Sequence, residues 1–80
     1  MGTTQISVEF EGSPGDTRDL ECVSIFEAHG GTFFHCGTLL VWPPVRDRTF
    51  DVPEENVPAL KKALRRARFR RVNIQFETLI

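Results

Sequence analysis

With 80 residues the chain has the length of one domain, and its 40% hydrophobic content, including seven Phe and one Trp, excludes intrinsic disorder. No apolar run approaches the ~18–20 residues that a membrane span needs, and the opening residues lack a secretion signal. The formal charge of −1 combines three basic and ten acidic groups in residues 1–60 with seven basic and one acidic in residues 61–80. We therefore expect a single cytoplasmic domain over residues 1–80, with no membrane association and with a strong charge dipole.

The first half of the sequence predicts three β-strands. In Thr4–Glu11 apolar and polar residues alternate, which is typical of a half-buried strand, and the turn-forming residues of Gly12–Arg18 predict a loop. We expect Asp19–Ala28 to form the second strand and His29–Gly31 to be a tight hairpin turn in which the glycines adopt positive φ. The very apolar segment Thr32–Trp42 then forms the third strand, and the two prolines that follow end it.

The second half predicts a short strand, one helix and a final strand. Thr49–Val52 is compatible with a short fourth strand. We expect a helix from Val57 to about Arg68, because its apolar residues share one arc roughly 120° wide and its basic residues occupy the opposite arc. Phe69 would fall within the basic arc, so we expect the chain to turn there and return this ring to the core. Alternation in Arg71–Ile80 predicts the last strand.

The predicted order β-β-β-(β)-α-β indicates a two-layer α+β fold, with a mixed, mostly antiparallel sheet and one helix packed on one face. The first three strands would form an antiparallel meander, and the strand–helix–strand unit would be parallel. Two of the strands are apolar on both faces, so one helix would leave an apolar sheet face uncovered. Self-association as a homodimer through that face is the expected solution, and curling of the sheet is the alternative.

Catalytic and metal-binding patterns are not supported by the sequence. His35 and Cys36 are successive residues of a predicted strand, so their side chains point to opposite faces and cannot form a nucleophile–base pair. The carboxylates of Asp16, Asp19 and Glu21 lie near a polar loop, where we expect them to be solvated. Neither paired Cys/His spacing nor a glycine-rich phosphate loop occurs. We therefore expect no enzymatic activity, no cofactor and no metal.

Two binding functions remain. The first is a small protein–protein interaction module of accessory, regulatory or inhibitor type, which acts as a homodimer and binds another protein. The alternative is a nucleic-acid-binding protein that uses the basic segment 61–71 for phosphate contacts, although a charged, solvated helix face would give the same pattern. The candidate binding residues are Lys61, Lys62, Arg65, Arg66, Arg68, Arg70, Arg71 and Trp42.

Overall fold

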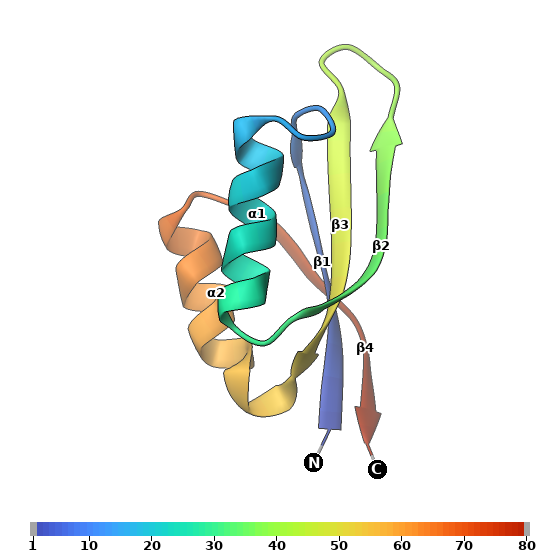
Figure 1. Cartoon of the computed structure of the whole chain (residues 1–80). Coiled ribbons are helices and arrows are strands. Elements are labelled where there is room, and N and C mark those ends of the chain that lie inside the picture. The colour runs from blue at the N-terminus through green and yellow to red at the C-terminus, as the bar shows by residue number, and fades with distance from the viewer. Residues whose placement is uncertain (1, 80) are drawn as a thin grey trace.

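The computed structural model describes the backbone of residues 2–79 and the side chains of residues 2–74. Within this range the chain folds into a four-stranded sheet and two α-helices, so the predicted α+β class is confirmed. The strands lie in the order β2-β3-β1-β4, and each neighbouring pair is antiparallel (Figure 1). The elements are β1 (Gly2–Glu11), α1 (Thr17–Ala28), β2 (Thr32–Leu39), β3 (Val45–Pro53), the 3₁₀ turn η1 (Glu54–Asn56), α2 (Val57–Arg66) and β4 (Arg71–Leu79).

This element order, β-α-β-β-α-β, is that of the ferredoxin-like, or split βαβ, motif. Strand β1 lies between β3 and β4 and is antiparallel to both. Strands β3 and β4 therefore run parallel to each other, with β1 between them. The expectation that the helix joins two parallel strands is therefore confirmed. The predicted meander is wrong, since β2 pairs with β3 at the sheet edge while β1 lies in the centre, and no neighbouring strands in the described sheet are parallel.

The predicted second strand is wrong, because Asp19–Ala28 belongs to helix α1. Asp16 begins this helix as its N-cap, and its carboxylate accepts a 2.9 Å hydrogen bond from the backbone N–H of Asp19. Such a cap satisfies one of the N–H groups that have no partner within the helix. The apolar residues of the segment fit an alternating pattern as well as a helical one, so the cap is the feature that distinguishes the two.

The predicted hairpin turn at His29–Gly31 is wrong for the same reason, because these residues end α1. Gly30 has φ 76°, and its N–H donates to the carbonyl of Glu27. The N–H of Gly31 donates to the carbonyl of Phe26 at 2.8 Å. These two bonds form the Schellman motif, which ends helices at a glycine with positive φ.

Both helices lie on the same face of the sheet (Figure 1), so two helices cover the face for which one was predicted. The rings of Phe26 on α1 and Phe50 on β3 stack with their centroids 4.3 Å apart. The expected return of Phe69 to the core is confirmed, since only 2% of its surface is exposed. The buried core consists of Ile6, Val8, Phe10, Cys22, Phe26, Phe50, Val52, Leu60, Leu64 and Phe69.

The opposite face of the sheet is polar along its two central strands, which corrects the expectation of an uncovered apolar face. The residues that alternate with the core residues pair across β1 and β3 as Gln5 with Asp51, Ser7 with Thr49, and Glu9 with Asp47. The amide of Gln5 donates a 3.3 Å hydrogen bond to the carboxylate of Asp51. A polar face of this kind needs no covering layer.

Candidate functional site

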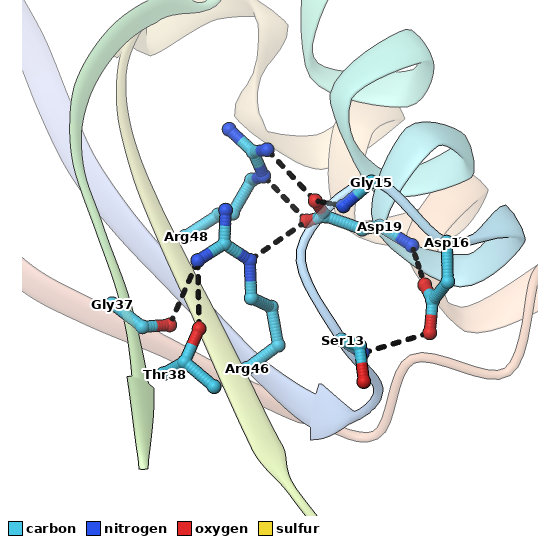
Figure 2. A network of polar contacts seen from close by, with 8 residues as sticks. All are labelled: Ser13, Gly15, Asp16, Asp19, Gly37, Thr38, Arg46 and Arg48. Carbon is cyan, nitrogen blue, oxygen red and sulfur yellow. Dashed lines mark hydrogen bonds and ion pairs between the residues drawn. The ribbon is translucent and has the colours of Figure 1, made fainter. Parts of the chain in front are cut away.

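The most buried charged group in the described part of the chain is the carboxylate of Asp19, whose residue has 0% of its surface exposed. Its oxygens accept hydrogen bonds from Nε of Arg48 at 2.6 Å, from Nη2 of Arg48 at 2.9 Å and from Nε of Arg46 at 3.2 Å. The backbone N–H of Gly15 donates a fourth bond at 2.8 Å (Figure 2). The expectation that Asp19 is solvated is therefore wrong.

The same network reaches the edge strand and the loop before α1. Nη1 of Arg46 donates to the carbonyl of Gly37 at 3.3 Å and to Oγ1 of Thr38 at 2.9 Å. On the other side, the carboxylate of Asp16 accepts bonds from the backbone N–H groups of Ser13 and Asp19 (Figure 2). The network therefore joins the β1–α1 loop, α1, β3 and β2 at one end of the molecule.

The environment of Asp19 fixes its ionisation state. The hydrogen bonds from Arg48 hold the pKa of its carboxyl well below the ordinary value of 3.8, and the bond from the N–H of Gly15 adds to this effect. The same contact raises the pKa of Arg48. A carboxylate that stays ionised, with its oxygens already occupied by four donors, is unsuited to general acid or base catalysis at neutral pH. This cluster is a structural network.

The buried thiol of Cys22 is not a reactive centre. Burial raises the pKa of the Cys22 thiol to about 12, so this group is protonated and a poor nucleophile. Cys36 is half-buried and, like Cys22, is a free thiol. In the β2–β3 register Cys36 lies opposite Arg48 whereas His35 lies opposite Thr49, so the two neighbours face opposite sides of the sheet, as predicted. Among the residues that the structure describes, no group of three or more His, Cys, Asp or Glu is placed to hold a metal ion.

Exposed apolar side chains gather on the edge strand β2 and on the loop that follows it. Leu40 and Trp42 are 89% and 91% exposed, and their loop extends beyond the helices at one end of the molecule (Figure 1). We call the whole set the apolar edge: Phe33, Phe34, Leu39, Leu40, Val41 and Trp42.

Five of the predicted basic residues gather where α2 leads into β4. A hollow of about 360 Å³ is lined there by Lys61, Arg65 and Arg70 around Phe69 and Val72. An adjoining hollow shares Phe69 and Arg70, and its other lining residues include two carboxylates as well as cations: Arg18, Arg68, Arg71, Phe10, Glu9 and Glu11. We call these five cationic residues the basic corner: Lys61, Arg65, Arg68, Arg70 and Arg71.

The structure thus divides the predicted site residues into separate groups. Lys62 and Arg66 are exposed on α2 but line neither hollow. Trp42 follows β2, at one edge of the sheet, whereas the basic corner precedes β4, at the other edge. The eight predicted binding residues therefore do not form a single ligand-binding site.

Comparison of the sequence with protein-family models and with curated proteins finds no match. Within the described residues no helix has both the length and the apolar content that a membrane crossing requires. Assignment of a function therefore depends on the surfaces described above.

Replacing Asp19 by Asn should lower the free energy of unfolding by about 3 kcal/mol, because the buried side chain of Arg46 and the partly buried one of Arg48 would lose their counter-ion. The matched control is Glu21→Gln, which removes a carboxylate from the same helix but breaks only the exposed pair with Arg18. Its cost should stay below about 1 kcal/mol. Urea unfolding of both variants measures the difference, and equal losses would contradict the structural role of Asp19.

The contribution of Asp19 should also depend on pH. Its pKa is lower in the folded protein than the ordinary value of 3.8, so the unfolded chain binds a proton more readily than the folded protein. The stability that ionised Asp19 contributes is therefore fully present above about pH 5. It is lost as the pH falls through about 4 towards the pKa of Asp19 in the folded protein. The difference in unfolding free energy between the wild type and Asp19→Asn should narrow from pH 6 to pH 2. A difference that stays constant would refute this assignment.

Proposed function

We propose that the chain is a small, non-enzymatic interaction module that acts as a homodimer through its apolar edge. The observation that carries this proposal is the exposure of six large apolar side chains along one edge strand and the loop that follows it, with Leu40 and Trp42 almost fully exposed. Contiguous apolar patches of several hundred Å² are uncommon on monomeric proteins and mark interaction sites. Trp is also among the residues that most often anchor interfaces.

The chemistry of the edge strand supports a second copy of the chain as the occupant. The segment from Thr32 to Pro44 contains no Asp, Glu, Lys or Arg. Natural edge strands are usually protected by charged residues against pairing with another strand, and β2 lacks this protection. Two copies related by a two-fold axis therefore meet without like-charge repulsion along this segment. The part that follows the register shift, His35–Leu39, pairs regularly with β3 and presents its free edge for antiparallel pairing.

The total exposed apolar area of these residues sets the upper limit of such an interface. Scaled by their exposed fractions, the six side chains offer on the order of 700 Å², close to the ~800 Å² per partner that interfaces of standard size bury. The sequence predicted a dimer contact through an apolar sheet face. The open face of the sheet is polar along its central strands, so it supports this contact less well than the apolar edge does. We therefore move the proposed dimer contact from the sheet face to the β2 edge.

A binding role is further supported by the state of the reactive groups. The carboxylate of Asp19 is held in ion pairs, and the thiol of Cys22 is protonated. Two free thiols suit a reducing compartment, and for that reason we propose a cytoplasmic location. An accessory or regulatory protein that recognises a further protein partner fits the same surface.

The dimer predicts a molar mass of about twice 9.1 kDa in sedimentation equilibrium at about 50 µM protein, well above a micromolar dissociation constant. The double variant Leu40→Ser with Trp42→Ser should sediment as a monomer, because it removes the two most exposed apolar side chains. Ile74→Ser is the matched control, since Ile74 is 42% exposed on β4, at the opposite edge of the sheet from β2, and should leave the mass of the dimer unchanged. A wild-type protein that stays monomeric at this concentration would contradict the proposed dimer.

A further inference from the structure

Helix α2 carries charge of one sign only. Its sequence VPALKKALRR contains four basic residues and no Asp or Glu. Lys61 and Arg65 are four residues apart, as are Lys62 and Arg66, so the helix brings together two pairs of like charges, each of which destabilises it. A helix that needs only a soluble surface usually mixes both signs. The favourable interaction of Arg65 and Arg66 with the carboxyl end of the helix does not extend to the lysines.

The fold directs part of this charge into one hollow. Lys61 and Arg65 come from α2 and Arg70 from the segment before β4, and the three line the hollow whose other walls are Phe69 and Val72. Among the described side chains no carboxylate lines it. Residues 61–71 contain seven basic residues. Within the part of the chain that the structure describes, Arg71 is the one of these seven that forms an ion pair, with Glu9 at 3.2 Å. Among the side chains that the structure describes, the three cations of the hollow therefore have no ion-pair partner.

The segment that carries Arg70 is held firmly in place. Arg68 has φ 68°, which reverses the chain after α2, and the N–H of Phe69 donates to the carbonyl of Leu64 at 2.9 Å. The guanidinium of Arg18 lies 3.7 Å from the centroid of the Phe69 ring and donates to the carbonyls of Ala67 and Arg68. The backbone from which Arg70 projects is thus fixed before a ligand binds, which reduces the entropy lost on binding.

The same contacts indicate which anion fits. Proteins that bind single-stranded nucleic acid stack bases on exposed aromatic rings. Among the described residues, the aromatic rings at the basic corner are those of Phe69 and Phe10, which are 2% and 7% exposed, and Arg18 covers the Phe69 ring. The central strands of the open sheet face carry polar and acidic residues in place of aromatic ones. The basic corner is therefore suited to contact phosphates and not to stack bases. A duplex offers phosphates at high density, with one charge per ~1.7 Å of its axis.

We propose that the basic corner binds the phosphate backbone of double-stranded nucleic acid, through Lys61, Arg65 and Arg70, without reading the base sequence. This site does not rest on the proposed dimer. The apolar edge and the basic corner lie at opposite edges of the sheet, so a dimer formed through β2 would leave both copies of the corner accessible.

The test is a fluorescence-anisotropy titration of the full chain with a labelled DNA duplex of about 20 base pairs at several salt concentrations. Three phosphate contacts predict that log K falls against log salt with a slope of about −3. Lys61→Gln with Arg65→Gln should weaken binding at least ~10-fold and bring the slope to about −1. The matched control is Lys62→Gln with Arg66→Gln, which has the same charge change and spacing on the same helix but lies outside the hollow. It should weaken binding less than ~3-fold.

Four outcomes would overturn the proposal. No binding at low salt would leave the corner as a solvated surface. Equal losses of duplex affinity in the two double variants would show that binding depends on the net charge of the protein and not on the hollow. Tighter binding of a single strand of the same length would indicate base stacking at another surface. Competition by inorganic phosphate at a concentration as low as that of the duplex phosphates would indicate a site for a small anion. All four substituted side chains are exposed, so both variants are expected to fold.

Discussion

The buried carboxylate of Asp19 joins the two layers of the fold at the end from which the β2–β3 loop projects (Figures 1 and 2). It meets Arg46 and Arg48 of the sheet where a hydrophobic contact would otherwise be expected. Removing these charges from water is costly, and the hydrogen bonds offset the cost only when each donor reaches its acceptor. The network therefore favours one position of α1 over the sheet. It also positions the loop before α1, because the N–H of Gly15 donates to the same carboxylate.

This constraint extends to both proposed surfaces. Arg46 reaches from the network to Gly37 and Thr38, so it fixes the part of β2 that leads into the exposed loop. The N–H of Gly12 donates to the carbonyl of Pro44 at 3.0 Å and holds the other end of that loop. At the far edge of the sheet, Arg18 of α1 holds the segment that precedes β4. The placement of α1 thus determines how the apolar edge and the basic corner are presented.

The sequence was sufficient for the parts of the fold in which one periodicity dominates. Helix α2 separates apolar from basic residues into two arcs, and β1 alternates regularly, so both were predicted near their observed bounds. Helix α1 was missed because its apolar residues fit both periodicities. The local signal that could have identified it is Asp16, an N-cap residue three positions before Asp19.

The candidate sites were predictable in part. The basic residues of α2 and Trp42 were identified as exposed binding residues, but their division between two edges depends on the strand order, which no local pattern encodes. Arg46 and Arg48 lie outside the predicted short strand Thr49–Val52, so the sequence did not place them in the sheet. The register with β1 places them opposite Phe10 and Val8, on the buried side of the sheet. Buried charges are predictable only when the partner is known, and Asp19 is 27 residues away from Arg46 in the sequence.

In the proposed dimer, the β2 edge and its loop pair with a second copy of the chain. Hydrogen exchange of the backbone amides, measured at low and at high protein concentration, tests this most directly. We expect the amides of residues 32–42 to become more protected as the protein concentration rises, and the protection of amides near the basic corner to stay unchanged. Protection of β2 that does not depend on concentration would contradict it, because the exposed edge would then remain unpaired.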